Sequence, residues 1–244
     1  MVSEAGDAGS PQPGSAEPGP QLDIFDAAAR KAANALTDTA IARVQDPGGR
    51  VRVEDFLAVL AALTGEATLV ATGVMDIEAT DLTPGAPVFG DPMNLLLTGD
   101  QLDPAAAPPG SVVGVLVREL VPHVVPLDAF ADLRGAYARM AAGVGAAGWG
   151  GVVTSVPEAN QPRVLPIQVA YELREAAGDA LGQSGLPAAR RHELCALALA
   201  SGLRLAKGAI DPRVAVTLAL EVTFGMAKMV PMSRRAYEAM AKPG

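Results

Sequence analysis

The chain has 244 residues, of which 47 are alanine, two are histidine and one is cysteine, and its formal net charge is −8. This length supports one large domain or two modest ones, while the acidic charge argues against a nucleic-acid partner, because phosphate binding needs clustered lysine and arginine. The scarcity of histidine and cysteine leaves few places for nucleophilic, acid–base or metal-ligand chemistry, so we expect no catalytic residue, no cofactor and no metal.

The first 21 residues are rich in proline and glycine and hold almost no large apolar side chain. Such a segment buries too little surface to offset its ordering entropy, so we expect residues 1–21 to form a disordered tail. It also lacks the basic start and apolar run of a secretory signal. Because a single cysteine makes no internal disulfide, a cytoplasmic location is expected.

Two helices are expected next. From 22 to 44 the apolar residues fall on one stripe, with Asp26 and Arg30 spaced as an i,i+4 ion pair. A second helix is predicted over 53–63, with acidic residues in its first turn and Gly65 just beyond its end.

Three short strands are predicted in the same half of the chain. Residues 67–75 place threonine and valine at alternating positions, which fits a strand although a continued helix is the close alternative. Residues 111–118 and 151–156 are short apolar runs. The nearly uncharged stretch 56–75 is the one membrane candidate, but Glu66, two glycines and three threonines interrupt it. We therefore expect no membrane partner.

The rest of this half combines loops with shorter helices. Residues 76–110 are rich in proline, with a short helix predicted over 92–98 and a longer amphipathic helix over 127–142. The pair Asp91–Pro92 is a favourable helix start, because the carboxylate caps free N–H groups and proline fills the first helical position.

The last 80 residues carry the clearest helical signals, near 166–182, 187–206, 212–229 and 233–242. Short connections between them predict antiparallel packing. The segment from Leu194 to Leu203 contains no charged residue. We expect it and the next helix to form the centre of a bundle or of an oligomer interface.

These elements together predict a mainly helical α+β protein. A mixed unit with a few short strands would span 22–160 and an antiparallel helical bundle 161–244, with a soft boundary that allows a single domain. Residues 1–160 carry a net charge of −12 and residues 161–244 carry +4. Their attraction favours docking within one chain or head-to-tail self-association.

Glu221 is the polar residue of greatest interest, because it lies within the otherwise uncharged stretch from Val214 to Ala227. An ionised buried carboxylate is costly unless it is paired. Arg204 or Lys228 is the simplest partner, and a ligand amine or a proton-transfer role is the alternative.

Three further residues are candidates for buried polar, ligand-facing or interface roles. His192 begins an H-E-L-C-A run that lacks the second histidine of a zinc-protease helix. Cys195 lies three residues later and could face His192 as a reactive thiolate, although its apolar neighbours favour a structural thiol. Trp149, alone among glycines, is a candidate interface anchor or a core residue.

The sequence favours a non-catalytic cytoplasmic protein that self-associates, as a homo-oligomer, or holds another protein. The alternative is a small-molecule enzyme or ligand-binding protein with a pocket between the helices and the strands, using Glu221, His192 or His123.

Overall fold

The computed structural model describes residues 25–77, 82–121, 123–143 and 151–241, so the expected tail over residues 1–21 lies outside it. The described chain folds into the following α-helices: α1 (Ala27–Val44), α2 (Val53–Ala71), α3 (Asp91–Leu97), α4 (Val112–Leu120), α5 (Leu133–Gly143), α6 (Pro166–Gly182), α7 (Arg191–Leu205), α8 (Pro212–Ala227) and α9 (Arg234–Ala241). Short 3₁₀ turns precede some of them, including η2 (Leu127–Phe130) and η4 (Ala188–Arg190).

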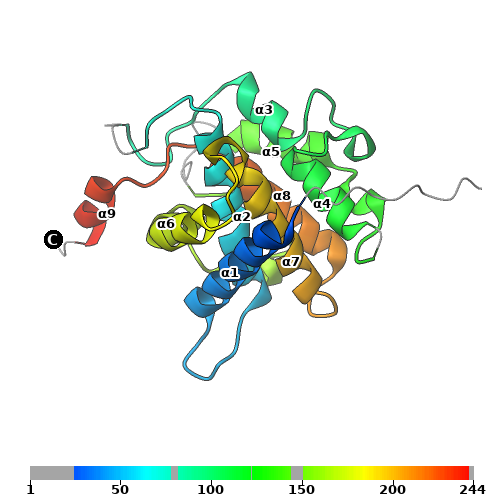
Figure 1. The fold of residues 1–244 in the computed structure, drawn as a ribbon, viewed down its shortest axis with the longest axis horizontal. Coiled ribbons are helices and arrows are strands. Elements are labelled where there is room, and N and C mark those ends of the chain that lie inside the picture. The colour runs from blue at the N-terminus through cyan, green and yellow to red at the C-terminus, as the bar shows by residue number, and fades with distance from the viewer. Residues whose placement is uncertain (1–24, 78–81, 122, 144–150, 242–244) are drawn as a thin grey trace, which may run out of the picture.

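The predicted α+β class is wrong. Within the described residues no strands join into a sheet, and extended backbone pairs only at isolated bridges, between Gln45 and Val51, Pro87 and Met229, and Lys207 and Ile210. The fold is therefore built from packed helices alone in the part of the chain that the structure describes (Figure 1).

The predicted strand over 67–75 is wrong because α2 continues to Ala71. Its threonines suit a buried helix, since the hydroxyl of Thr64 donates to the Leu60 carbonyl at 2.7 Å and that of Thr68 to the Thr64 carbonyl at 2.8 Å. Polar groups satisfied in this way cost little to bury. Threonine in the segment 67–71 is therefore compatible with a helix as well as with a strand.

The other two predicted strands are also wrong. Residues 111–118 begin α4, where the Ser111 hydroxyl accepts the Gly114 N–H at 3.1 Å and caps the helix, so capping and burial outweigh the β-branched valines. Residues 151–156 form no helix and no strand of a sheet among the described residues, and the Ser155 N–H donates to the Glu221 side chain.

Helix α2 forms the axis of the molecule, and Figure 1 shows it running through the middle of the other helices. It packs most extensively against α8 and α7, and also against α6 and α1. The four expected C-terminal helices are confirmed at α6 to α9. Their separate bundle is wrong, because α7 and α8 pack mainly on α2 and share few contacts with each other.

One continuous hydrophobic core joins the two halves of the sequence, since it includes residues from Phe25 to Met232. It contains most of α7 and α8, which accounts for the uncharged segment from Leu194 to Leu203 and for the single charge within Val214 to Ala227. The domain boundary near residue 160 stays a prediction, and the core crosses it.

Two glycines let the central helices approach closely. A methyl group on Gly65 of α2 would lie 2.6 Å from Cβ of Met226 on α8 and 2.9 Å from the Ala227 nitrogen. A methyl group on Gly202 of α7 would lie 2.5 Å from a methyl of Leu60 on α2. Both distances are far below van der Waals contact. The α2–α8 crossing requires glycine, because the Gly65 methyl would meet backbone atoms, whereas at Gly202 the methyl would displace the end of the Leu60 side chain.

The uncharged run 56–75 belongs almost entirely to α2, the best-buried helix. Among the described helices, none has the length and apolar character needed to cross a membrane.

We predict that Gly65→Ala lowers the free energy of unfolding by about 1–3 kcal/mol, because the added methyl forces α2 and α8 apart. Urea denaturation followed by circular dichroism measures the change. Gly178→Ala is the matched control, since Gly178 is also helical but has open space where a Cβ would lie. It should raise stability by up to about 1 kcal/mol. Equal shifts in the two variants would contradict the close-packing explanation.

Candidate ligand-binding cavity

A cavity of about 310 Å³ lies between α2, α6 and α7. Each helix lines it with residues spaced by three or four, which brings them onto one face. Its apolar walls come from Leu63, Ala67, Val70, Ala177, Leu181 and Ala188. The cavity opens to solvent beside Val70 and Asp76, which are both exposed.

A buried ion pair forms part of the cavity wall. Glu66 of α2 is 5% exposed, and its two carboxylate oxygens accept from Nε and Nη2 of Arg174 on α6 at 2.7 and 3.0 Å. The same Nη2 donates to the Met232 carbonyl at 2.8 Å, and the guanidinium lies over the Tyr171 ring. Glu66 is thus neutralised by a bidentate partner that is itself held in place.

Cys195 of α7 lines the inner part of the cavity. Burial raises the pKa of its thiol to about 12, with the nearby Glu66 charge acting in the same direction and the Arg191 charge opposing both. At neutral pH the sulfur is a thiol rather than a thiolate, so it is a poor nucleophile.

His192 lies outside this cavity. It is 2% exposed, and its Nε2 lies 3.1 Å from the Gly110 carbonyl oxygen, while no hydrogen-bond partner meets its Nδ1. Burial is the main cause that lowers its pKa, which favours the neutral ring. Among the described contacts, no hydrogen bond joins His192 to Cys195, so the less favoured alternative of a thiolate–imidazole pair is not formed.

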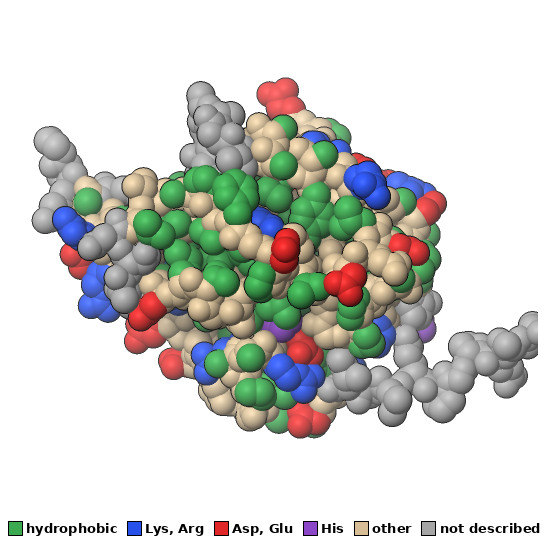
Figure 2. Space-filling model, turned by 90° about the horizontal axis from the view of Figure 1, so that it is seen from above, with side chains coloured by type: hydrophobic (Ala, Val, Ile, Leu, Met, Phe, Trp, Pro, Cys, Tyr) green, Lys and Arg blue, Asp and Glu red, His purple; other side chains and the backbone are tan. Residues whose placement is uncertain are grey.

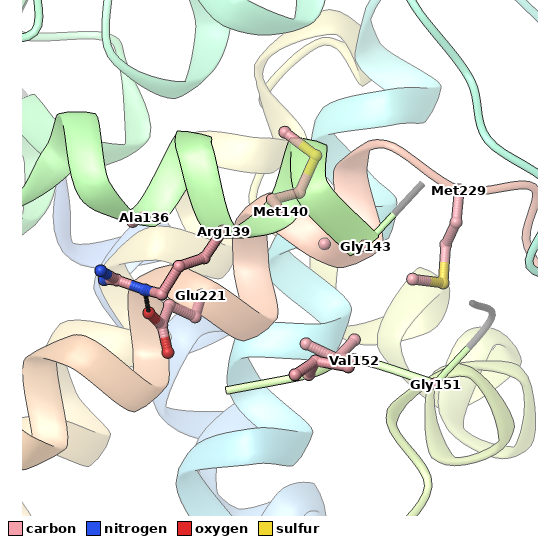
Figure 3. A pocket seen from close by; sticks show the side chains of 10 residues that line it. Ala136, Arg139, Met140, Gly143, Gly151, Val152, Glu221 and Met229 are labelled. Carbon is pink, nitrogen blue, oxygen red and sulfur yellow. Dashed lines mark hydrogen bonds and ion pairs between the residues drawn. The ribbon is translucent and has the colours of Figure 1, made fainter. Parts of the chain in front are cut away.

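Glu221 is buried and accepts three hydrogen bonds, of which Figure 3 shows the one from Arg139. Its carboxylate accepts from Arg139 Nε at 2.6 Å, from the Ser155 N–H at 2.6 Å and from the Ser155 hydroxyl at 2.8 Å. The adjoining cavity holds only about 20 Å³, room for about one water molecule. Glu221 therefore links α8 to α5 and to the segment that contains Ser155, and has no room for a ligand.

The two predicted partners of Glu221 are wrong. Arg204 donates to Glu119 Oε2 at 3.2 Å, and Lys228 donates to Asn94 Oδ1 at 2.6 Å. Both cations satisfy groups on other helices. The actual partner, Arg139, lies 82 residues earlier in the chain, beyond the reach of any local pattern.

The cavity contains polar residues that the sequence analysis missed. Glu66 carried a usable signal, because it interrupts an uncharged run just as Glu221 does. Arg174 and Arg191 had no such signal in the sequence, since arginine is common on half-exposed helices and at helix starts. Trp149, the candidate interface anchor, lies outside the described residues.

We predict that Glu221→Gln lowers the free energy of unfolding by about 1–3 kcal/mol, because the neutral amide replaces a carboxylate that accepts three hydrogen bonds. Thermal and urea denaturation measure this loss. Asp132→Asn is the matched control: Asp132 is the exposed second partner of Arg139, at 2.9 Å. It should cost less than about 1 kcal/mol. A larger loss in the control would refute the assignment of Glu221 as the main anchor.

Comparison of the chain with protein-family models, with curated proteins and with solved structures gives no match. Any function must therefore be argued from the geometry of the cavity and of the surface.

Proposed function

We propose that this chain is a non-catalytic binding protein that holds a small, largely apolar molecule in the cavity between α2, α6 and α7. The observation that carries the proposal is the cavity itself, whose 310 Å³ lie at the lower end of the range of about 300–1,000 Å³ typical of small-molecule sites. Its walls are mostly apolar, with a few fixed polar groups, as such sites usually are.

The packing around α2 supports this proposal. Helices α6 and α7 both pack on α2 but make little contact with each other, so space remains between them. Gly178 of α6 lines that space and has nothing within 4 Å of where a side chain would begin. The absence of a side chain at this position keeps the cavity open.

The chemistry of the lining favours binding over catalysis. The one thiol there is protonated at neutral pH, and the Glu66 carboxylate is fully engaged by Arg174. Within the described lining no base lies beside a nucleophile, the arrangement that covalent catalysis needs. We also propose a cytoplasmic location, since the single cysteine suits a reducing compartment.

We predict that the protein binds octanol, an uncharged apolar molecule, and that Gly178→Leu weakens this binding at least about tenfold. The leucine side chain fills the cavity, and it also favours the helix more than glycine does, so the fold is retained. Isothermal titration calorimetry measures the affinity.

The matched control is Gly182→Leu, at the exposed end of the same helix, where nothing lies within 4 Å of the added Cβ. Gly182 is not among the cavity residues, so this variant should bind octanol like the wild type. Absence of octanol binding by the wild type, or unchanged binding by Gly178→Leu, would remove the proposal.

A second candidate function is self-association through an apolar surface. Figure 2 shows hydrophobic side chains spread over the face seen from above, with few charged groups among them. Helix α3 lies on this side of the molecule. Its Leu95 is 48% exposed, and Phe89, in the segment just before α3, is 71% exposed. Large exposed apolar patches commonly mark protein contacts.

For this second candidate we predict that the wild type forms a dimer at micromolar concentration and that Phe89→Ser shifts it toward monomer by at least about tenfold in dissociation constant. Aromatic anchors of this kind contribute about 2 kcal/mol or more to an interface. Sedimentation equilibrium measures the shift, with Leu205→Ser, an exposed apolar residue at the end of α7, as control. A wild type that stays monomeric rules the candidate out.

A further inference from the structure

Arg191, the first residue of α7, lines the cavity, and within the described residues its side chain forms no hydrogen bond or ion pair. Its Nε is buried and donates no hydrogen bond, and no carboxylate of the described residues forms a salt bridge with its guanidinium. A buried donor left without an acceptor costs free energy, and the cost is larger for a charged group. The guanidinium is therefore ready to receive an acceptor that enters the cavity.

The other charged groups of the lining leave this positive charge uncompensated in the interior. Glu66 is bound on both oxygens by Arg174, so these two charges cancel within the wall. Asp76 lies exposed at the mouth, where water and salt screen its charge. The start of α7 adds the positive end of a helix dipole on the same side.

From this arrangement, and resting on the proposed function, we infer that the ligand is a small amphipathic monocarboxylate, with its carboxylate on Arg191 and its apolar body between α2 and α6. Guanidinium and carboxylate match as a planar, bidentate pair. One arginine balances one negative charge, whereas a phosphate dianion would require more donors than the mainly apolar lining provides.

The apolar part of the cavity matches the rest of such a molecule. The walls beyond Arg191 are formed by alkyl side chains such as Leu63 and Leu181, and the protonated thiol of Cys195 adds no charge. A linear or compact hydrocarbon body therefore loses water there without leaving polar groups unpaired.

The test compares octanoate, octanol and octylamine, which share one apolar body and differ in the charge of the head. Calorimetry on the full chain gives the dissociation constant of each for the wild type and for Arg191→Gln. We expect the octanoate dissociation constant, divided by the octanol dissociation constant, to rise at least about tenfold in Arg191→Gln. The reason is that the charge-assisted hydrogen bonds between the guanidinium and the carboxylate are lost. The octanol constant should stay within about twofold.

Arg213→Gln is the control, since it changes the net charge equally at an exposed site that pairs with Asp128 at 2.8 Å. It should leave all three affinities unchanged, and circular dichroism confirms that both variants fold. Two outcomes overturn the inference and leave the proposed function intact. In the first, octanol binds but Arg191→Gln does not change the ratio of the octanoate to the octanol dissociation constant. In the second, octylamine binds more tightly than octanoate. If the wild type binds none of the three, both fail.

Discussion

The fold depends on the close approach of α2 to α8 and α7, which glycine permits at Gly65 and Gly202. A helix enclosed on nearly all sides needs small residues where other helices cross it, and the alanine-rich composition supplies most of them. Because α2 is the axis, its position also determines where Glu66 and Leu63 lie. The same contact that closes the core therefore places one wall of the cavity.

Two buried glutamates illustrate how the environment separates structural from binding roles. Glu221 receives three hydrogen bonds and adjoins a space for about one water molecule, so it joins segments of the chain. Glu66 is also fully paired, but its partner Arg174 stands in the wall of a much larger cavity. There the pair sets the local charge and leaves Arg191 as the group able to accept an anion.

The cavity arises from a geometric mismatch between helices. Helices α6 and α7 both lie against α2, yet they contact each other little, and Gly178 supplies no side chain to fill the gap. A chain that packed only for stability would place a leucine there, since cavities are costly. The exposed apolar residues Phe89 and Leu95 are a separate feature. The apolar segments of α7 and α8 do not support an interface, because they are buried in the core of the chain itself.

The sequence by itself determined most of the helices and the need to pair Glu221. Asp211 before Pro212 marks the start of α8, and residues 166–182 match α6, because capping and apolar spacing are local signals. Only the tertiary structure decided that residues 67–71 and 111–118 are helical rather than extended, because helix hydrogen bonds, capping and packing on other helices outweigh β propensity. It also decided the partner of Glu221 and the lining of the cavity, because both join residues far apart in the chain, whose contacts follow from helix packing and leave no local pattern.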